Sequence, residues 1–583
     1  MPNDNHRLDP AVPALENHAF FEYFDYQHQP FRMPPELASG EKSRHPVCIA
    51  GGGPVGLAVA LDLAGYGIRS VVIEDGDTLS YGSRAGCISR RSLDIFDRIG
   101  VARPFMEKGL PWTMGFSYYR DAEVLRFSMP DDDRQKFPPM INLPQNFMEQ
   151  YLFDAVSKCD LIEVRWQQKV TGVDAGAGEG VAVDISTPSG AYRLHADWLI
   201  AADGARSTVR KSMGLKLHGE SYQGRYLIAD IRLDSKRPAG RLAWFDPPSN
   251  PGSTILMHKL TDEIWRFDYQ LQPEDGEEEA TDPERVSARI AAHLKMIGET
   301  GSWELSWISI YKANALTLEH YRHGRVLFAG DAAHPIPIFG VRGLNSGIDD
   351  AHNLAWKLAL AIRGIGGDRL LDSFSIERTG ATAENLRNAK KSTVFMSPPS
   401  PAYTLMRSAV LSLVISHPWL NTLINPRQSA AIHYQDSPLS SRDAPLDFDG
   451  GPRPGEPMAQ IPIRAAKGPG VEFLTEAVGR HFLAIWFCAD GKLPADLQPA
   501  LERLQQKDLP FRYCVVTPAA AANHPWVLAD EGGIAASAYG IRGSGLYLVR
   551  PDGYVAARWI APTLNDIDAA LRRAAGKEPG DEI

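Results

Sequence analysis

The stretch CIAGGGPVGLAVALDLAGYGIRSVVIEDG, Cys48 to Gly76, places a glycine-rich turn between apolar segments. This pattern predicts a buried strand, a helix and a second strand, that is, a βαβ unit. Gly51, Gly53 and Gly56 would allow a tight turn, close approach of the backbone to a pyrophosphate and close helix–strand packing. Glu74, twenty-one residues after Gly53, lies where an acid accepts hydrogen bonds from a ribose hydroxyl. We therefore predict a dinucleotide site, with FAD and NAD both open at this point; the alternative is a glycine-rich turn in another α/β unit.

Length and composition predict a multidomain enzyme. A chain of 583 residues is too long for one ordinary core, so we expect two or three domains. A formal charge of −10 without a long basic run argues against nucleic acid or an anionic membrane as a partner. The five cysteines stand far apart, which predicts neither a disulfide framework nor a metal site. The N-terminus lacks a signal-peptide pattern and no apolar run is long enough for a membrane span, so a cytoplasmic enzyme is expected.

Two later stretches add aspartates at the ends of predicted strands. In ADWLIAADGARSTVRKSMGL, residues 196–215, a buried strand leads into Asp203 and Gly204. In GRVLFAGDAAHPIPIFGVRGLNSGIDDAHNLAWKLALAIRG, residues 324–364, a buried strand ends at Gly330 and Asp331. A loop rich in proline and glycine follows, and a long helix is predicted to begin near Leu344. Asp331 has the alternative role of an N-cap for that helix.

The three segments resemble the GxGxxG, DG and GD motifs of the FAD-dependent aromatic hydroxylases, over roughly residues 46–395. These are single-component flavoprotein monooxygenases that include p-hydroxybenzoate and phenol hydroxylases. The resemblance implies FAD as the cofactor and NAD(P)H as the co-substrate. It further implies that Arg84 reaches the FAD phosphates or ribose, Gln145 contacts the flavin side, Asp203 lies near the pyrophosphate and Asp331 binds ribityl or ribose hydroxyls.

The start of the long helix should face the flavin ring. Backbone N–H groups of Leu344 and Asn345 would stabilise the negative charge of a reduced flavin, because a helix N-terminus carries a partial positive charge. Gly343, with Gly340 and Gly347, would let the backbone approach the ring closely. Pro337 and its neighbour Ile338 should form one wall of the substrate site.

The predicted fold class is α/β, and the resemblance implies a Rossmann-like FAD-binding domain of the p-hydroxybenzoate hydroxylase type with an inserted α+β substrate domain. The last part of the chain resembles the thioredoxin-like C-terminal domain of the phenol hydroxylase branch. Within residues 221–312, four segments enriched in β-branched and aromatic residues and the helix PERVSARIAAHLKMI predict an antiparallel sheet with helices on one face. Cys488 lacks a CxxC partner, so the last domain should be structural or dimer-associated rather than redox-active. RPDG, Arg550 to Gly553, predicts a β-turn. The expected boundaries are 1–45 for an N-terminal extension, 46–220 and 313–395 for the FAD-binding domain, 221–312 for the substrate domain, 396–455 for a helical linker and 456–583 for the thioredoxin-like domain.

The function implied is that of a monooxygenase that hydroxylates a phenolic ring with NAD(P)H and O₂ through a flavin C4a-hydroperoxide. A phenol ionises with a pKa of about 10, so a base or cation in the pocket should help to ionise it. Trp244, His258 and Tyr269 are the candidates on the predicted sheet, although each has core packing as its alternative role. The partners expected are a small phenolic substrate and O₂, with a homodimer as one option for assembly. A flavin-dependent dehydrogenase or epoxidase and a non-catalytic flavin-binding protein are the alternative functions.

Overall fold

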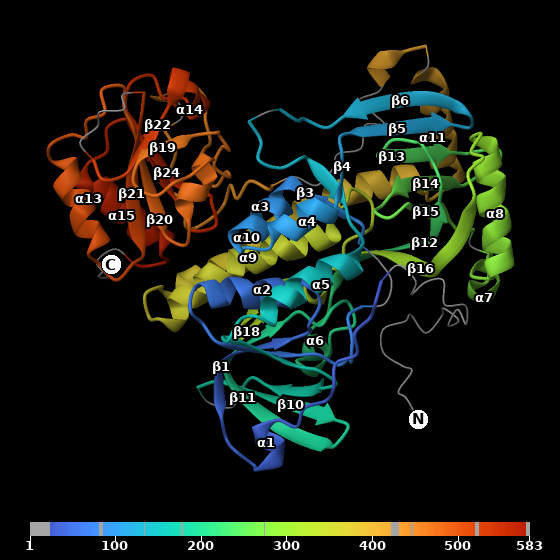
Figure 1. The fold of residues 1–583 in the computed structure, drawn as a ribbon, viewed down its shortest axis with the longest axis horizontal. Coiled ribbons are helices and arrows are strands. Elements are labelled where there is room, and N and C mark those ends of the chain that lie inside the picture. The colour runs from blue at the N-terminus through green and yellow to red at the C-terminus, as the bar shows by residue number, and fades with distance from the viewer. Residues whose placement is uncertain are drawn as a thin grey trace.

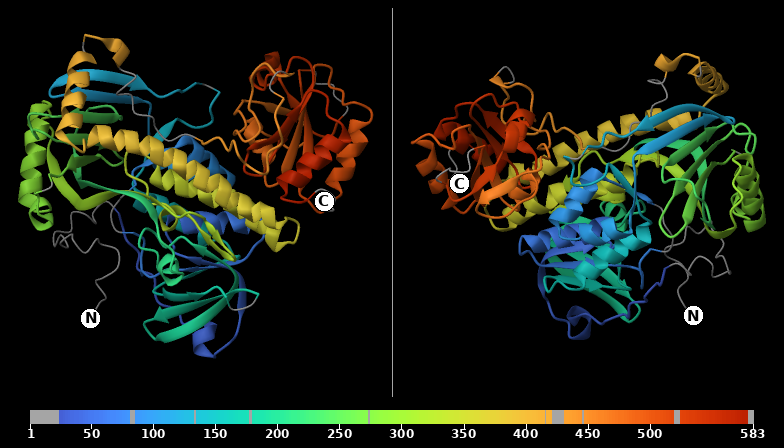
Figure 2. Two further views of the ribbon diagram at one scale, coloured as in Figure 1. Left: turned by 180° about the vertical axis from the view of Figure 1, so that it is seen from behind. Right: turned by 45° about the horizontal axis from the view of Figure 1, so that its top comes forward.

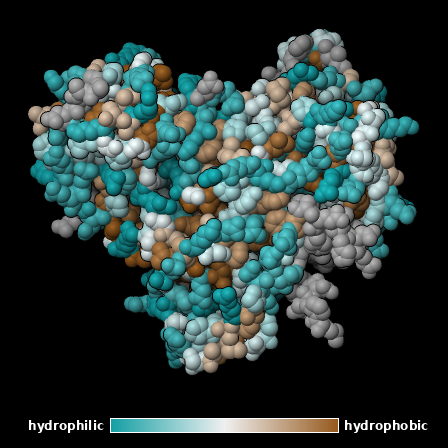
Figure 3. Space-filling model, in the orientation of Figure 1, coloured by the Kyte–Doolittle hydropathy of each residue, from teal (hydrophilic) through white to brown (hydrophobic). Residues whose placement is uncertain are grey.

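The computed structural model describes residues 24–80, 85–132, 134–176, 179–272, 274–414, 416–420, 431–444, 447–518 and 524–578. These residues form three lobes, each with its own sheet (Figure 1). The face drawn in Figure 3 is mainly hydrophilic, with hydrophobic residues gathered toward the middle, where the lobes meet. Among the residues described, no helix combines the length and the apolar character needed to cross a membrane.

The first lobe contains an eight-stranded sheet whose central strands are parallel. Its order is β17 (Arg322–His323), β18 (Val326–Phe328), β11 (Gly190–Ala201), β1 (Arg44–Ala50), β2 (Ser70–Ile73) and β8 (Ile162–Arg165), with β10 (Val181–Thr187) and β9 (Lys169–Asp174) continuing from β11. Residues of β1 from Val47 onward and all of β2 are buried, as expected for parallel strands covered on both faces. The carboxyl ends of β1, β11 and β18 lie at one edge, because Ala50 pairs with Ala201 and Ala201 pairs with Phe328. The three motifs that follow these strands therefore meet at this edge.

The helices of this lobe pack against its sheets and against one another. They are α1 (Pro35–Ala38), α2 (Pro54–Gly65), α3 (Arg90–Arg98), α4 (Ala102–Lys108), α5 (Gln145–Val156), α6 (Thr208–Ser212), α9 (Gly343–Ile362) and α10 (Asp368–Met396). A small sheet of β3 (Cys87–Ser89), β7 (Met140–Asn142) and β4 (Leu110–Trp112) adjoins them. The described part of the N-terminal extension packs on this lobe, where the Phe24 ring lies 5.2 Å from that of Phe147.

The second lobe contains a seven-stranded sheet. Its order is β16 (Trp303–Thr317), β12 (His218–Leu233), β15 (Ile264–Gln270), β14 (Thr254–Lys259), β13 (Arg241–Phe245), β5 (Met114–Tyr119) and β6 (Ala122–Ser128). The helix α8 (Pro283–Met296) covers one face, and α7 (Glu277–Ala280) precedes it. The strands and helix expected between residues 221 and 312 are all present. The structure departs from the predicted domain boundaries at β5 and β6. These two strands belong to the second lobe, although they come from residues expected in the FAD-binding domain. They join this sheet because β5 pairs in parallel with β13, a long-range pairing that leaves no local sequence signal.

The C-terminal lobe contains a six-stranded sheet. Its order is β19 (Arg464–Lys467), β22 (Val527–Ala529), β21 (Phe511–Thr517), β20 (Phe482–Phe487), β23 (Gly545–Val549) and β24 (Val555–Trp559). The helix α13 (Leu497–Gln505) connects the parallel strands β20 and β21, while β23 and β24 are antiparallel. The helices α14 (Ile534–Ala538) and α15 (Leu564–Ala574) complete the lobe, and α11 (Pro401–Val414) lies in the expected linker. Cys488 and Cys514 are buried free cysteines.

The long helix α10 connects the three lobes, as the views in Figure 2 show. At its beginning the Gly367 N–H donates to the Ala575 carbonyl in the C-terminal lobe at 3.3 Å. At its end the Met396 carbonyl accepts from the Thr254 hydroxyl of the seven-stranded sheet at 2.7 Å. The two ends of α10 therefore contact both outer lobes through backbone groups.

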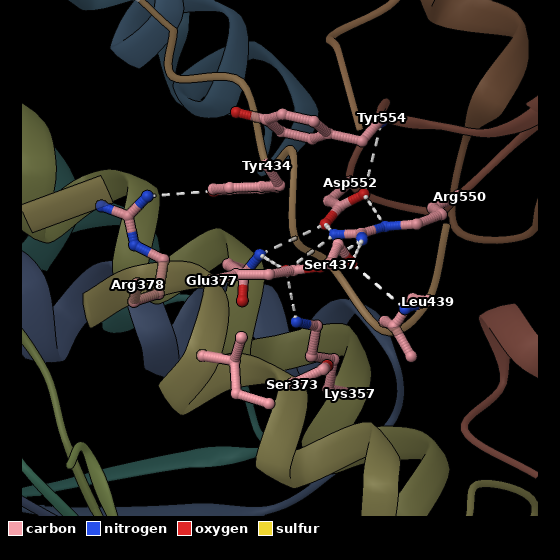
Figure 4. A network of polar contacts seen from close by, with 12 residues as sticks. Lys357, Ser373, Glu377, Arg378, Tyr434, Ser437, Leu439, Arg550, Asp552 and Tyr554 are labelled. Atoms are coloured by element: carbon pink, nitrogen blue, oxygen red, sulfur yellow. Dashed lines mark hydrogen bonds and ion pairs between the residues drawn. The ribbon is translucent and has the colours of Figure 1, made fainter. Parts of the chain in front are cut away.

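A buried ion network attaches the C-terminal lobe to α9 and α10 (Figure 4). Arg550, in the turn after β23, is fully buried and donates to both Glu377 oxygens at 2.5 and 3.0 Å. Glu377 also accepts from Lys357 of α9 at 2.6 Å. Asp552 accepts from Arg550 Nε at 3.0 Å and from the Trp356 indole at 3.1 Å. The predicted turn is present, since the Gly553 N–H donates to the Arg550 carbonyl at 2.9 Å, but its side chains also form this interdomain contact.

Candidate functional site

The turn between β1 and α2 has room for glycine only at two positions. Gly51 has a φ of +103°, and a Cβ there would lie 2.4 Å from the Ala202 carbonyl oxygen. A Cβ on Gly56 would lie 2.0 Å from the Gly51 carbonyl oxygen. Gly53, the N-cap of α2, borders a cavity instead. The N-terminus of α2 is therefore open to an anion such as a phosphate.

Glu74 supports this turn from the end of β2. Its Oε2 accepts from the Gly52 N–H at 2.7 Å, and its Oε1 accepts from the Gly76 N–H at 2.9 Å. The carboxylate is buried beside the glycines. In the structure it therefore fixes the shape of the turn.

The cavity at the edge of the first sheet has a volume of about 430 Å³. From the FAD-binding motifs its walls receive Gly53, Gly204, Gly330 and Asp331, and from the start of α9 they receive Gly343, Leu344 and Asn345. Gln145, the first residue of α5, also lines it and accepts from the Ala85 N–H at 3.2 Å. Arg84 lies outside the described residues.

The two aspartates of the later motifs differ in their surroundings. Asp331 is exposed in the short turn Gly330–Ala332 and lines the cavity. It is not the N-cap of α9, which begins at Gly343 after Arg342. Asp203 is half-buried and accepts from the Val209 N–H at 3.1 Å, and burial raises its pKa. Asp203 therefore fixes the turn that leads into α6, while the adjacent Gly204 lines the cavity.

The start of α9 is fixed by the side chain of Asn345. Its Oδ1 accepts from the Ser89 N–H at 2.9 Å and from the Ser92 hydroxyl at 2.7 Å. Its Nδ2 donates to the Val341 carbonyl at 2.8 Å. The first turn of this 20-residue helix therefore points its N–H groups toward the cavity in a fixed orientation.

Asp350 joins the loop after β18 to α10. Its Oδ2 accepts from the Gly330 N–H at 2.9 Å and contacts His334, and its Oδ1 accepts from Arg378 at 2.6 Å. Burial alone would raise its pKa, but His334 and Arg378 hold the pKa at about 2. His334 thus has a structural partner, and the ionised Asp350 fixes the backbone next to Asp331.

The opposite wall of the cavity is a polar row across the seven-stranded sheet. Arg241 pairs in register with His258, His258 with Arg266, and Arg266 with Asp230. Arg266 donates to both Asp230 oxygens at 2.8 Å, and Asp268 lies 3.7 Å from His258. Four of these five residues line the cavity directly, whereas Asp230 does not.

Burial and neighbouring charge shift the pKa values in this row. Burial, together with the charges of Arg241 and Arg266, lowers the pKa of His258 to about 3, so its imidazole is neutral. Burial raises the pKa of Asp268 to about 6, against the opposing effect of Arg266. Nη1 of Arg241 and Nδ1 of His258 have no hydrogen-bond partner among the described residues.

The structure corrects three of the four proposed pocket residues. Trp244 and Tyr269 lie on the other face of the sheet, in the core under α8, where the Trp244 ring lies 4.5 Å from that of His293. Side chains alternate along a strand, so they cannot share the face of Arg241 and Asp268. Pro337 is buried, while Ile336 and Ile338 on either side of it line the cavity. His258 alone of the four lies in the cavity wall.

Sequence reasoning missed Arg241, Arg266 and Asp268, although a signal was present. In β15, Ile264–Gln270, charged residues alternate with aromatic ones, and the aromatic set packs under α8. Charged residues that alternate with buried aromatics identify the face that does not enter the hydrophobic core.

We expect Asp268 to make the protein less stable as pH rises. Its folded-state pKa of about 6 exceeds the ordinary 3.8, so the folded state binds more protons than the unfolded state between these values. Stability should therefore fall from about pH 4.5 to about pH 7.5, by about 2 kcal/mol in total. Thermal unfolding of wild type and Asp268→Asn across this range measures the effect. If the stabilities of wild type and Asp268→Asn changed in parallel with pH, the effect assigned to Asp268 would be contradicted.

Known proteins resemble this chain in sequence. The sequence profile of the FAD binding domain family matches residues 44–389. A 3-(3-hydroxy-phenyl)propionate/3-hydroxycinnamic acid hydroxylase of Mycolicibacterium smegmatis is 31% identical over 332 residues, which span 57% of this chain and 58% of that relative. A 6-methylpretetramide 4-monooxygenase of Streptomyces rimosus is 28% identical over 544 residues, or 90% of this chain and 92% of the relative.

Solved structures share the fold over almost the whole chain. The flavin-dependent monooxygenase PieE, in complex with FAD and substrate, has a TM-score of 0.76 at 23% identity and covers 92% of this chain and 100% of its own. Aklavinone-11 hydroxylase, in a ternary complex with FAD and aklavinone, has a TM-score of 0.72 at 25% identity and covers 91% and 99%. The mixed α/β architecture, with its C-terminal lobe, is therefore common to these proteins.

Proposed function

This chain belongs to the FAD binding domain family, and we propose that it is an FAD-dependent monooxygenase that hydroxylates a phenolic aromatic substrate. NAD(P)H is the proposed reductant and O₂ the source of the oxygen atom. The relatives named as aromatic hydroxylases and monooxygenases support this assignment.

One observation carries the proposal: a single cavity joins the FAD-binding motifs to the polar face of a second sheet. Gly53, Gly204 and Asp331 border it on one side, and Arg241 and His258 border it on the other. A cofactor held by the first set would face a substrate held by the second. Cavities between lobes are common sites for such pairs.

The residues present fit FAD. The open N-termini of α2 and α9 suit its phosphates and the negative charge of its reduced ring, and glycine backbone at Gly53, Gly204 and Gly330 permits close approach. Asp331 and Gln145 would hold its hydroxyls and ring edge. When bound and reduced, FAD activates O₂ for insertion of one oxygen atom into an aromatic ring.

The chain itself would orient the ring and prepare its hydroxyl group. Ile228, Leu256 and Phe339 line the cavity and exclude water from the reacting carbon. Asp268, once ionised, and the neutral imidazole of His258 are the acceptors available for the phenol proton. Proton removal makes the ring electron-rich, as attack on an activated oxygen requires.

We also propose the domain roles. Residues 46–220 and 313–395, without β5 and β6, would bind FAD, and residues 221–312 with these two strands would bind the substrate. The unit β20–α13–β21, followed by antiparallel β23 and β24 and the helix α15, supports a thioredoxin-like C-terminal domain. Its buried Cys488 has no CxxC partner, which supports a structural role.

The purified protein tests the function directly. We expect it to be yellow and to oxidise NAD(P)H when phenols are added, with products one oxygen atom heavier. A desaturated or epoxidised product would favour the flavin dehydrogenase or epoxidase. Bound FAD without oxidation of any donor would favour the non-catalytic flavin-binding protein.

Asp331→Ala is expected to lower the FAD content of the purified protein by about tenfold or more, because it removes charged hydrogen bonds to cofactor hydroxyls. The ratio of visible to ultraviolet absorbance measures this content. Asp368→Ala, at the exposed start of α10, is the matched control and should leave the content unchanged. Full retention of FAD in Asp331→Ala would contradict the assigned role.

A further inference from the structure

We propose that the helix α11 and the short helix η3 (Pro418–Leu420) dock on an anionic lipid surface, with their apolar side chains in the lipid and cations of α10 at its headgroups. This inference concerns a surface that the proposed function does not use. We call this surface the docking face. It consists of five exposed apolar residues and two cations that border them: Tyr403, Leu405, Met406, Leu413 and Trp419, with Arg387 and Lys391.

Exposed hydrophobic side chains gather at this one place. Nine large hydrophobic residues are exposed in the described part of the chain, and five of them lie between residues 403 and 419. Leu405 is 72% exposed and Trp419 is 70% exposed. Single hydrophobic residues are normal on a protein surface, but a contiguous group of them marks an interaction site.

The helix α11 is apolar on both of its faces. Leu411 and Val414 are buried in a hydrophobic cluster that includes residues of the seven-stranded sheet. Leu405, Ala409 and Leu413 recur at intervals of four on the other face, and all three are exposed. A surface helix usually has a charged outer face, whereas a helix with an apolar outer face is suited to contact with a core or with lipid.

Arg407 fixes the orientation of α11. Its side chain is buried, and its Nη1 donates to the Met396 carbonyl at 3.1 Å and to the Phe395 carbonyl at 3.3 Å. Arg407 is the one charged residue in the sequence of α11, and it lies on the buried face. The helix is therefore held with its apolar face outward, at the margin of the molecule beside the seven-stranded sheet (Figure 2).

The charge around the docking face differs from that of the whole chain. The formal charge of −10 argues against an anionic surface as a partner for the chain as a whole. The acidic residues are unevenly distributed, however. The chain has 71 of them among 583 residues, but none lies between positions 385 and 435, a stretch that holds five lysines and arginines. The docking face therefore lies in a locally basic part of the chain.

A groove between α10 and α11, with a volume of about 670 Å³, collects these cations. Its lining includes exposed basic residues of α10 beside apolar residues of α11: Arg387, Lys390, Lys391, Tyr403 and Met406. Glu384 also lines it, and Glu220 pairs with Lys390 at 2.6 Å. The cations of the groove, with Arg407, outnumber these two acids, so its net charge is positive.

An anionic lipid surface fits these features better than a second copy of the chain. A twofold contact would place the same positively charged surface of two copies side by side, and like charges repel. Lipid instead accepts the side chains of a single amphipathic helix, and tryptophan and tyrosine favour the boundary between headgroups and acyl chains. Each nearby lysine or arginine adds attraction to anionic headgroups.

Co-sedimentation of the purified full-length protein with lipid vesicles tests the proposal. One set of vesicles contains phosphatidylcholine alone, and the other contains equal parts of phosphatidylcholine and phosphatidylglycerol. We expect wild type to bind the mixed vesicles about tenfold or more tightly than the neutral ones, and to bind them less tightly at high salt. Equal affinity for the two sets, or binding to neither, would overturn the inference.

Two charges placed on the apolar face test its contact with lipid. Leu405→Glu combined with Leu413→Glu should weaken binding to the mixed vesicles by about tenfold or more, because ionised carboxylates resist entry into an apolar layer. Ile534→Glu is the matched control, because it alters an exposed apolar residue of the C-terminal lobe, and it should bind like wild type. The melting temperature and FAD content of each variant report its fold.

Removal of two cations tests the charge preference separately. Arg387→Gln combined with Lys391→Gln should reduce the preference for mixed vesicles by about tenfold and leave binding to neutral vesicles within about twofold. Lys211→Gln combined with Lys216→Gln removes two exposed cations of the first lobe and should keep the preference. A preference that survives loss of the docking-face cations would contradict their assigned role.

Light scattering distinguishes lipid from a second copy of the chain. A wild type that forms dimers, binds no vesicles and becomes monomeric on substitution of Leu405 and Leu413 would show that the docking face joins two copies. The lipid proposal would then be wrong. Oxygenation of phenols in solution should be the same in wild type and in the docking-face variants, so the proposed function and this inference can fail independently.

Discussion

Replacing Arg550 by methionine is expected to destabilise the docked C-terminal domain by about 3–5 kcal/mol, because it removes one member of a buried ion network. Glu377 and Asp552 would remain as two buried carboxylates, with Lys357 as the cation that still pairs with Glu377. Calorimetric melting should show a lower transition for the C-terminal domain. Limited proteolysis should also cut the chain between α11 and β19 more rapidly.

Two further variants show whether the charges themselves are responsible. Arg550→Met combined with Glu377→Gln removes one charge of each sign and should recover part of the loss, since Lys357 and Asp552 then balance each other. Arg464→Met breaks an exposed pair with Glu531 in the same domain and should change stability by less than about 1 kcal/mol. An Arg550→Met protein that melts like wild type would show that the network does not hold the domain.

The same residue shows what sequence reasoning can and cannot reach. The turn at Arg550 to Gly553 was predictable because its signal is local, and Gly553 has the positive φ of 80° that such turns require. The ion network was not predictable, because Arg550 meets Glu377 across 173 residues of sequence. Nothing in the RPDG tetrapeptide identifies its distant partner.

The candidate site likewise has features that the sequence predicted and features that it did not. The family and the strands of the second sheet were predicted correctly, because glycine motifs and strand patterns are encoded over short distances. The inward face of that sheet was left open, and Trp244 and Tyr269 proved to be core residues. The alternation of charged and aromatic residues in β15 carried a signal for the two faces, and the position of α8, a tertiary property, shows which of them is the core. Asp350 was overlooked because its partners Gly330, His334 and Arg378 lie on separate elements.

Asp350→Ala is expected to abolish stable FAD binding and to destabilise the first lobe by about 3–5 kcal/mol, because Arg378 loses its buried counterion. The Gly330 N–H and His334 would also lose their acceptor, so the backbone beside Asp331 would lose its fixed position. The FAD content of the purified protein and its melting temperature, with and without added FAD, measure the two effects.

Asp62→Ala is the matched control because it breaks the other buried histidine–aspartate pair of α9, in which His352 lies 2.7 Å from Asp62. This pair joins α9 to α2 away from the loop after β18. The control should therefore lower the melting temperature without lowering the FAD content. If both variants lost FAD equally, general instability would explain the loss. If Asp350→Ala kept its FAD, the loop would hold its shape without this carboxylate, and its assigned role would be wrong.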